Sequence, residues 1–381
     1  MNSLVIVGAG LAGYTLAKEI RKLDKQSPLH IITQDDGHFY SKPMLSNALS
    51  KHKTADALVT TTAIEMAAQL NATIWSNSVV KNIDTETRSI TTDQRVVNYQ
   101  NLVLAIGATQ IKPPFKGNAK DDVVSVNNLR DYEKFRSLLE DANQVAIVGP
   151  GLIGCEFAND IVDTGRDVTV IGPGNTPLDR LLPPQAGRAL QDKLGQLGVK
   201  WHLGVTADSV DRKNGGVVIA LSDGNSVQAD LVLSAVGLKP NIELAANAGL
   251  EVNRGIVVDR YLQTSASNIY ALGDCAEING MVLPFVLPIM HSARALAQTL
   301  CGAPTKLSFP AMPVVVKTPA HSIVVSSPPY NAAGDWQVSV EEGGVRALFQ
   351  DAEQKLLGFV LTGAAVQDKQ KLTKELPPVL E

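Results

Sequence analysis

Two apolar runs of strand length in this chain are each followed by a glycine-rich turn and a helical pattern. The first run, 4–7, is rich in β-branched residues and is typical of a buried strand. Alanines and leucines spaced three and four apart from Leu11 to Leu23 predict a helix that packs on this strand. The same succession returns at 144–162. The pattern therefore predicts two strand–turn–helix units.

The first turn reads G-A-G-L-A-G and contains Gly8, Gly10 and Gly13. At this spacing the first glycine makes a tight turn, the second lets the backbone approach a pyrophosphate, and the third lets helix and strand pack closely. The helix N-terminus carries roughly half a positive charge, which suits a diphosphate. An acid about 20 residues on would hold a ribose hydroxyl. Asp35 fits, with Asp36 as the neighbouring candidate, so this unit is predicted to bind a dinucleotide.

The second turn repeats the pattern with Gly149, Gly151 and Gly154. It differs where the second strand ends, because 172–174 reads Gly-Pro-Gly and offers no acid for a free 2′-hydroxyl. No arginine stands there to hold a 2′-phosphate either, and Arg180 is the nearest base. We therefore expect NADH rather than NADPH. Two dinucleotide units in one chain indicate that something passes between the two nucleotides.

Other candidate residues stand at strand ends and in loops. The loop 40–46, Y-S-K-P-M-L-S, either returns toward a cofactor or is a plain surface loop. The strand 102–106 runs into a Gly-Ala-Thr turn, which suits close contact with a ligand or is an ordinary strand exit. Asp274 follows a predicted strand and either approaches a ligand or caps a helix. His291 precedes a predicted helix, 292–300, and an isolated histidine is more often packed or solvated than catalytic.

The remaining pattern predicts the domain organisation. Paired prolines at 112–114 indicate a linker, and 237–241 marks a crossing between domains. From Met312 onward, apolar and alternating runs of strand length predict a small antiparallel β module with a short tail at 368–374.

Composition narrows the class of protein. A chain of 381 residues can hold two or three domains, and 45% hydrophobic with 19% charged residues is ordinary for a soluble globular protein. The net charge of −4 argues against nucleic acid as the main partner. No apolar run approaches the ~20 residues that span a bilayer. Cys155, Cys275 and Cys301 are far apart, which signals neither a disulfide framework nor a zinc site and fits the cytoplasm.

The motifs, in this order, resemble those of the flavoprotein disulfide-reductase superfamily, whose members have two dinucleotide domains. Besides the glycine turns, the resemblance rests on A-I-G-A-T at 105–109, A-V-G-x-x-P at 235–240 and Y-A-L-G-D-C-A at 270–276. Within it, the chain is similar to NADH-dependent reductases of small iron–sulfur proteins, and especially to the rubredoxin–NAD(+) reductases of alkane-degrading bacteria. That similarity rests on the 40–46 loop, G-C-E-F-A-N-D at 154–160, V-K-T-P-A at 316–320 and K-E-L-P at 374–377.

The resemblance implies an α/β fold with two Rossmann-like domains, the second inserted in the first, and a small α+β domain with an antiparallel sheet. The FAD-binding domain would comprise 1–112 and 241–311, the NADH-binding domain 113–240, and a C-terminal interface domain 312–381. The resemblance further implies FAD and NADH as cofactors, rubredoxin as partner, no nucleic acid, no membrane span and a cytoplasmic location. We expect a monomer.

The resemblance also implies roles for single residues. Lys42 and Pro43 would lie near the flavin, Asp274 would hold the ribityl chain, Glu156 would lie near nicotinamide and flavin N5, and Lys317 would face the flavin N1–C2=O edge. Lys42, Glu156 and Lys317 are the candidate catalytic residues. The full set of candidate cofactor-binding residues is Gly8, Gly10, Leu11, Ala12, Gly13, Asp35, Lys42, Pro43, Val80, Ala105, Gly107, Ala108, Gly149, Gly151, Ile153, Gly154, Glu156, Gly237, Gly273, Asp274, His291 and Lys317.

The cysteines bear on the mechanism that the resemblance implies. Disulfide reductases of the superfamily need a cysteine pair beside the flavin, and the first domain has none; Cys155 reads as a small buried residue. We therefore expect hydride transfer from NADH to FAD and release of single electrons to rubredoxin, in support of alkane hydroxylation. Lys317 and the helix start near His291 are the candidates for stabilising negative charge on the flavin, and Glu156 is expected to pair with Lys42.

The acceptor and its docking surface are less closely defined. A basic patch near the flavin edge would suit an acidic rubredoxin, and Lys369, Lys371 and Lys374 cluster in the tail, although such a run is usually a solvated face. The alternatives are a ferredoxin that feeds an oxygenase, O₂ or a quinone as acceptor, and a non-catalytic module that binds both nucleotides and signals redox state.

Overall fold

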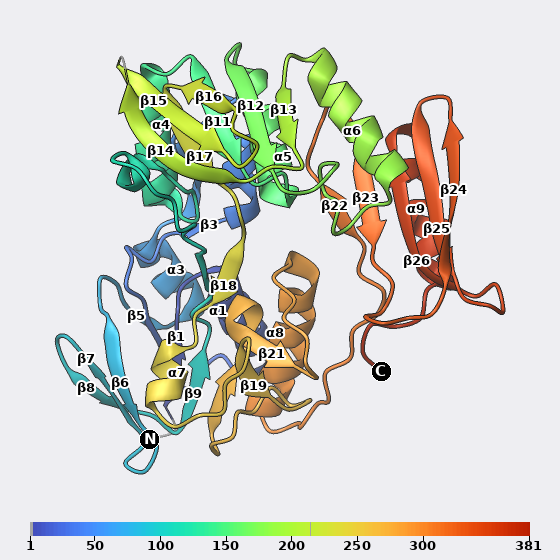
Figure 1. Ribbon diagram of the computed structural model, residues 1–381. Helices are drawn as coiled ribbons and strands as arrows, with labels where there is room; N and C mark the ends of the chain where they lie inside the picture. Colours follow the sequence, from blue (N-terminus) through green and yellow to red (C-terminus); the bar gives the residue numbers. More distant parts are fainter. Residues whose placement is uncertain (1–2, 214) are drawn as a thin grey trace.

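The first part of the molecule is built on a parallel five-stranded sheet. The computed structural model describes residues 3–213 and 215–381. The sheet has the order β20-β9-β1-β2-β5 and lies in the lower half of Figure 1. The helices α1 (Leu11–Leu23) and α8 (Val286–Leu300) pack against each other, and their buried residues share one hydrophobic core with the strands. The strands are β1 (Leu4–Val7), β2 (Leu29–Ile32), β5 (Thr73–Trp75), β9 (Asn101–Leu104) and β20 (Ile269–Ala271).

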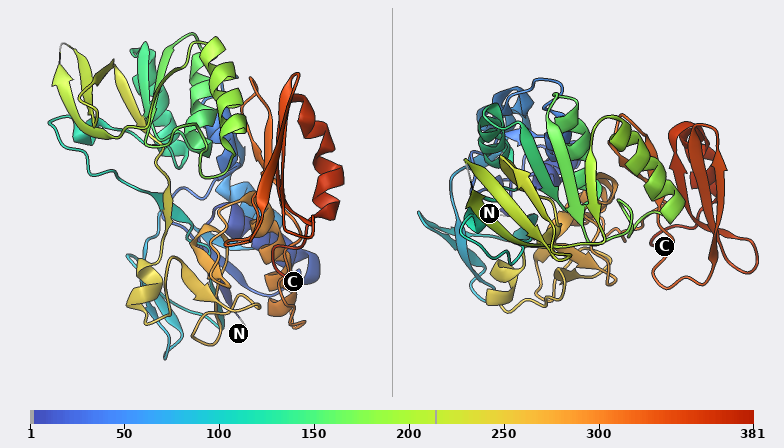
Figure 2. Two further views of the ribbon diagram at one scale, coloured as in Figure 1. Left: turned by 45° about the vertical axis from the view of Figure 1, so that its right-hand side comes forward. Right: turned by 45° about the horizontal axis from the view of Figure 1, so that its top comes forward.

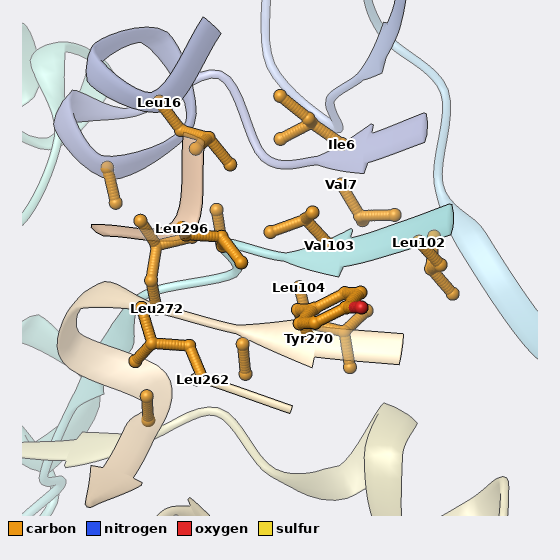
Figure 3. Packing of buried hydrophobic residues seen from close by; sticks show 14 of the residues in the cluster. Ile6, Val7, Leu16, Leu102, Val103, Leu104, Leu262, Tyr270, Leu272 and Leu296 are labelled. Carbon is orange, nitrogen blue, oxygen red and sulfur yellow. The ribbon is translucent and has the colours of Figure 1, made fainter. Parts of the chain in front are cut away.

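Apolar side chains of these elements form a continuous core. Figure 3 shows Leu16 of α1 and Leu296 of α8 beside Val103 of β9, and all three are fully buried. Burial of this kind is the main favourable contribution to folding, at about 25 cal/mol for each Å² of apolar surface removed from water. The short β-branched strands of the first unit are therefore central strands covered by helices, as their sequence predicts.

The second part repeats the plan of the first. Its parallel sheet has the order β13-β12-β11-β17, with α5 (Leu152–Val162) following the glycine turn. Each part also has a three-stranded antiparallel sheet, β6-β7-β8 in the first and β14-β15-β16 in the second. The strands are β11 (Gln144–Val148), β12 (Asp167–Gly172), β13 (Lys200–Leu203), β17 (Leu231–Ser234), β6 (Val80–Asp84), β7 (Ser89–Thr92), β8 (Val96–Asn98), β14 (Ala207–Lys213), β15 (Gly216–Leu221) and β16 (Ser226–Ala229).

Two adjacent strands connect these parts. The chain leaves the first sheet through β10 (Ala108–Gln110) and returns through β18 (Leu238–Pro240), and the two strands pair antiparallel. Figure 1 shows β18 as the connection between the upper and lower parts. The insertion of one Rossmann-like unit into the other is thereby confirmed, whereas the exact domain boundaries stay a prediction.

The C-terminal part is an antiparallel sheet with both faces covered. Its order is β22-β23-β26-β25-β24. On one face, Ala347 and Val360 share a core with α6 (Pro184–Gln196), and on the other Phe359 and Leu361 pack with Leu372 of the terminal helix α9 (Figure 2). The elements are β22 (Val314–Val316), β23 (Ile323–Ser326), β24 (Asp335–Glu341), β25 (Gly344–Gln350), β26 (Leu356–Thr362), η4 (Gly363–Asp368) and α9 (Lys369–Glu375).

The structure adds elements to those expected from the sequence. Helices form at α3 (Ala63–Leu70) and α4 (Leu129–Glu140), where the charged residues of α4 obscure its apolar stripe. The 40–46 loop contains the 3₁₀ helix η1 (Lys42–Asn47). The remaining elements are β3 (Phe39–Tyr40), α2 (Ala55–Leu58), β4 (Val59–Thr61), η2 (Lys120–Asp122), α7 (Glu243–Asn247), β19 (Ile256–Val258), η3 (Gly273–Cys275) and β21 (Ala276–Ile278).

The expected start of the last helix before the C-terminal part was wrong. The helix α8 begins at Val286, six residues before the predicted Ser292. Pro288 lies in its first turn, where a proline is tolerated because the backbone N–H there has no acceptor within the helix. Across residues 3–213 and 215–381, no helix combines the length and apolarity needed to cross a membrane.

Candidate functional site

In the first glycine turn, two glycines are closely packed and the third faces open space. Gly8 has a φ of +112°, and a Cβ atom there would overlap the carbonyl group of Ala105. A Cβ atom at Gly13 would overlap the carbonyl oxygen of Gly8. At Gly10, by contrast, a Cβ atom would meet nothing within 4 Å. The outer glycines are therefore required by the fold, and the middle one leaves a face of the backbone open to a ligand.

The second turn has the same division. A Cβ atom at Gly149 would lie 2.6 Å from the carbonyl oxygen of Ala235, and one at Gly154 would overlap the carbonyl oxygen of Gly149. Gly151 again faces open space. Ile153, the second residue of α5, is 43% exposed. The two turns thus offer equivalent open backbone to two ligands.

Several candidate residues meet at the carboxyl ends of the first sheet. Gly273 has a φ of +81°, and its backbone approaches Ala12 closely enough that a Cβ atom would lie 2.8 Å from the Ala12 side chain. Asn241 donates from its side chain to the Ile106 carbonyl at 2.7 Å and from its backbone to the Gly107 carbonyl at 3.0 Å. Open α/β sheets bind their ligands at this edge.

The predicted ribose acid of the first unit is held by its own loop. Oδ1 of Asp35 accepts hydrogen bonds from the Thr33 hydroxyl at 2.6 Å and from the Gly37 N–H at 3.0 Å. The Asp36 carboxylate accepts from the His38 N–H at 2.9 Å. Asp35 is exposed and Asp36 is partly buried. The protein therefore orients Asp35 through Oδ1. Among the described residues, Oδ2 accepts no hydrogen bond, so it is open to a ligand.

Lys42 and Asp274 come together from opposite ends of the sequence. Lys42 is the first residue of η1, and Asp274 lies in η3 after β20. Burial lowers the pKa of Lys42, and the charges of Asp274 and Asp131 oppose this effect. Burial raises the pKa of Asp274, and the Lys42 charge opposes it. Both groups are thus partly removed from water with opposite charges near each other, an arrangement that recurs at functional sites.

A second cluster joins all three parts of the molecule at the carboxylate of Glu156. Glu156 is on α5 and is 3% exposed. Its carboxylate forms an ion pair with Nζ of Lys317 and accepts hydrogen bonds from the Ser46 hydroxyl and, at 2.9 Å, from the Lys317 backbone N–H. The Lys317 ammonium also donates to the Ser46 oxygen at 3.2 Å. One buried charge therefore joins the second unit, η1 of the first unit and the loop after β22 of the C-terminal part.

This arrangement corrects the expected pairing of Glu156 with Lys42. Glu156 forms its ion pair with the ammonium of Lys317. The negative charges that act on Lys42 are those of Asp274 and Asp131. The reason is tertiary: the loop after β22 crosses α5 and delivers Lys317 to it. The pairing between residues 161 positions apart is not visible from sequence spacing.

Sequence reasoning missed two further polar residues of α5. Asp160, 3% exposed, accepts hydrogen bonds from the Leu49 N–H at 2.8 Å and from the N–H and hydroxyl of Ser50 at 3.0 and 2.6 Å. Asn159 accepts from the Ala320 N–H at 3.0 Å. Glu156, Asn159 and Asp160 are spaced three and four apart and share one helix face. Three polar residues at that spacing on an otherwise apolar helix could have indicated a buried polar contact on this face.

Replacing Asp160 by alanine should destabilise the folded protein, because two backbone N–H groups and a hydroxyl of the 49–50 segment lose a charged acceptor. An unsatisfied buried donor costs about 1–3 kcal/mol, so we expect a loss of ~3 kcal/mol in the free energy of unfolding. Asp192→Ala, at an exposed site on α6, is the matched control. Urea unfolding followed by circular dichroism measures both. Equal midpoints for the two variants would contradict the structural role of Asp160.

His291 lies beside the C-terminal end of α1, whereas the first glycine turn precedes the N-terminal end of that helix. Its ring packs edge-on against Phe309, with centroids 6.3 Å apart. It lines a cavity of about 410 Å³ with Lys22, Arg294 and Lys306. Burial and the charge of Arg294 lower its pKa. The helix α8 begins at Val286, so the expectation of a helix start near His291 was wrong, and the N-terminus that could face a ligand is at Val286.

The other candidates occupy defined places. Leu11 opens α1, Pro43 is the second residue of η1, Val80 opens β6, Ala108 opens β10, and Gly237, with a φ of +120°, precedes β18.

The cysteines of the described residues are free thiols. Cys155 and Cys275 are fully buried, whereas Cys301 is exposed. Burial raises the pKa of Cys155, and it raises that of Cys275 to about 12. A thiol that stays protonated is a poor nucleophile. Neither buried thiol is therefore suited to exchange with a disulfide.

Comparisons with known proteins agree with this geometry. The profile of the pyridine nucleotide-disulphide oxidoreductase family matches residues 2–299, and that of the rubredoxin binding C-terminal domain matches 306–376. The chain is 49% identical to a rubredoxin-NAD(+) reductase of Alcanivorax borkumensis, over 100% of both chains. It is 43% identical to one of Acinetobacter baylyi, over 100% of this chain and 99% of the relative.

The solved structures give the same fold. The ferredoxin reductase for the CYP199A2 system of Rhodopseudomonas palustris matches with a TM-score of 0.89 and 27% identity, covering 100% of this chain and 96% of the other. For the NADH:rubredoxin oxidoreductase of Clostridium acetobutylicum the TM-score is 0.81 at 24% identity, with 98% and 95% covered. With its paired glycine turns and these matches, the protein belongs to the pyridine nucleotide-disulphide oxidoreductase family and is an oxidoreductase with a C-terminal domain of the rubredoxin-binding family.

Proposed function

We propose that this protein is an FAD-dependent reductase that oxidises NADH and passes electrons to rubredoxin. The observation that carries the proposal is the Glu156–Lys317–Ser46 cluster, which joins both dinucleotide units and the C-terminal part at one point. A reductase that relays electrons between two ligands needs its binding units held in a fixed relation, and this cluster provides that relation.

The residues of the first unit fit FAD. The open backbone at Gly10 and the N-terminus of α1 suit a diphosphate, and the oriented carboxylate of Asp35 suits a ribose. Asp274 and Lys42 would hold the part of the cofactor nearer the second unit. When bound, FAD supplies the redox chemistry, because it accepts two electrons as a hydride and can release them one at a time.

The chain contributes positive charge and orientation. Glu156 and Ser46 hold the Lys317 ammonium in one place, and the N-terminus of α8 adds partial positive charge. Fixed positive groups stabilise negative charge that develops during a reaction more effectively than water does. Ile153 and Gly151 would contact NADH at the second turn. Because Cys155 and Cys275 are single buried thiols whose pKa values burial raises, electrons leave by a route without disulfide exchange.

Rubredoxin is the acceptor that the relatives favour. The C-terminal profile and the names of the Alcanivorax borkumensis and Acinetobacter baylyi proteins both refer to rubredoxin. Reduced rubredoxin would in turn support alkane hydroxylation, and three free cysteines fit a cytoplasmic location. An acceptor of the FlRd type is the second candidate, because a relative from Aliivibrio fischeri, 39% identical over 98% of the chain, is named a nitric oxide reductase FlRd-NAD(+) reductase.

Anaerobic spectroscopy tests the proposal in two steps. The purified protein should show flavin bands that bleach on addition of NADH, and added oxidised rubredoxin should then restore them while being reduced. Colourless protein that takes up no flavin would refute the cofactor assignment. Bleaching without rubredoxin reduction would refute the acceptor and direct the search to the second candidate and to ferredoxins.

Turnover with rubredoxin should fall as salt is added. A weak, charge-steered encounter loses attraction once the screening length drops from about 10 Å at 0.1 M salt to about 3 Å at 1 M. We expect kcat/KM for rubredoxin to fall about tenfold over this range. The rate at which NADH bleaches the flavin is the control, since it involves no protein partner. If salt changes kcat/KM for rubredoxin no more than it changes the bleaching rate, electrostatic docking would be contradicted.

A further inference from the structure

The second unit lacks an acid at the position where the first unit has one. The strand pairs β1–β2 and β11–β12 have the same register, with Val7 opposite Ile32 and Val148 opposite Ile171. In both, the first glycine of the turn donates to the carbonyl of the last paired residue, at 2.8 and 2.9 Å. Three residues after Ile32, the first unit has Asp35. Three residues after Ile171, the second unit has Gly174.

A carboxylate nevertheless occupies this position in the second unit. A Cβ atom at Gly174 would lie 3.0 Å from Oδ1 of Asp179, and Oδ2 of the same carboxylate lies closer still. Asp179 therefore fills the space into which a side chain at position 174 would extend. The residue is exposed, so its carboxylate is accessible to a ligand.

The loop that carries Asp179 is fixed to the second glycine turn. The N–H of Leu178 donates to the carbonyl of Pro150 at 2.9 Å, inside the Gly149–Gly151 turn. Leu178 is 2% exposed and has a φ of +58°, a conformation that leucine rarely adopts. Strained backbone of this kind persists only where the surroundings enforce it, and it is found at ligand sites. Here it directs the following residue toward Gly174.

The strand end that faces Asp179 is equally constrained. The carbonyl of Gly174 accepts a hydrogen bond from the Gly204 N–H at 2.9 Å, and that of Gly172 accepts one from the Val205 N–H at 3.2 Å. The backbone of the residue before Asp179 and the backbone of the strand end beside it are thus both held in place near the second glycine turn.

We propose that Asp179 is the ribose-binding acid of the second unit and the residue that selects NADH over NADPH. The inference rests on the proposed function, because it places NADH at the second turn. A carboxylate at this position accepts hydrogen bonds from the ribose hydroxyls. The same carboxylate repels the 2′-phosphate of NADPH. It therefore favours NADH and disfavours NADPH. Arg180, the nearest base in sequence, then lies beside an acid rather than forming a phosphate site.

Binding of NAD⁺ and NADP⁺ to the flavin-loaded protein, measured by titration calorimetry, tests the assignment without relying on activity. Asp179→Ala should weaken NAD⁺ binding about tenfold to a hundredfold, the value of a charge-assisted hydrogen bond or two, and should reduce the preference over NADP⁺. Asp167→Ala is the control, because Asp167 is an exposed acid at the opposite end of β12. Its affinities should stay within about twofold of those of the unchanged protein.

A transplanted acid separates the role of the carboxylate from any effect on folding. Gly174→Asp alone should weaken NAD⁺ binding, because its side chain meets Asp179. Combined with Asp179→Ala, the same change should restore the preference for NAD⁺, since the acid then stands as Asp35 does in the first unit. Asp179→Ala affinities equal to those of the control, or tighter binding of NADP⁺ than NAD⁺ by the unchanged protein, would overturn the assignment. The proposed function fails by a different result, an absence of bleaching with NADH.

Discussion

Replacing Gly13 by alanine should give a protein that is purified with little or no FAD. The added Cβ atom would overlap the carbonyl oxygen of Gly8, so α1 must move away from β1. The backbone N–H groups at the start of α1 then move from the place that we propose for the diphosphate. Loss of two charge-assisted hydrogen bonds corresponds to about a hundredfold or more in affinity. The ratio of flavin to protein absorbance measures the effect, and the free energy of unfolding of the apoprotein should fall by about 1–3 kcal/mol.

Gly10→Ala is the matched control for that result. Its backbone has a φ of −75°, which alanine adopts readily, and the new Cβ atom meets no protein atom within 4 Å. The apoprotein should therefore unfold within about 0.5 kcal/mol of the unchanged chain. FAD binding should still weaken about tenfold, because the methyl group stands on the open face of the turn. Unchanged FAD affinity in Gly10→Ala would mean that this turn does not hold the diphosphate.

Replacing Lys317 by methionine should slow the reduction of the flavin by NADH about tenfold to a hundredfold. The ammonium is the positive group that Glu156 and Ser46 hold between the two units. Its removal also leaves Glu156 buried without a cation. Breaking a fully buried pair costs about 3–5 kcal/mol, and we expect ~2–4 kcal/mol here, because the Lys317 side chain is 30% exposed. Anaerobic stopped-flow at saturating NADH measures the rate, and urea unfolding measures the stability.

The double variant Glu156→Gln with Lys317→Met separates the two effects. A neutral amide in place of the carboxylate removes the buried charge, so most of the lost stability should return. The rate should stay low, because no ammonium is present. A single variant that is reduced as fast as the unchanged protein would exclude Lys317 from the mechanism. A double variant that recovers both stability and rate would show that the ion pair acts only in holding the parts together.

Local sequence determines the two nucleotide units, and so they could be predicted. Within about 30 residues, a strand, the glycines of the turn and an amphipathic helix together permit one arrangement, and α1 begins and ends where the pattern predicts. The strands of the C-terminal part could also be predicted locally, because they read as alternating or continuous apolar runs of strand length. The fold class and the oxidoreductase family follow from these local units and their order.

The contacts between the parts could not be predicted, because they depend on how the parts pack. The pairing of Glu156 with Lys317 needs the loop after β22 to cross α5. Asp179 reaches Gly174 from a loop in which Leu178 has a left-handed conformation, and sequence spacing does not reveal this. The apolar stripe of α4 and the early start of α8 show a second limit, since charged residues and a proline conceal a helix that the surroundings support.

The order of strands in the first sheet also constrains how the nascent protein can fold. β9 ends at Leu104 and lies between β1 and β20, but β20 begins only at Ile269, 165 residues later. At about 5–20 residues per second, a ribosome needs roughly ten to thirty seconds to synthesise that stretch. During this time one side of β9 has no partner strand, and the inserted unit is synthesised before that partner is. The N-terminal half-sheet must therefore wait, with an open edge, for a segment translated after the inserted unit.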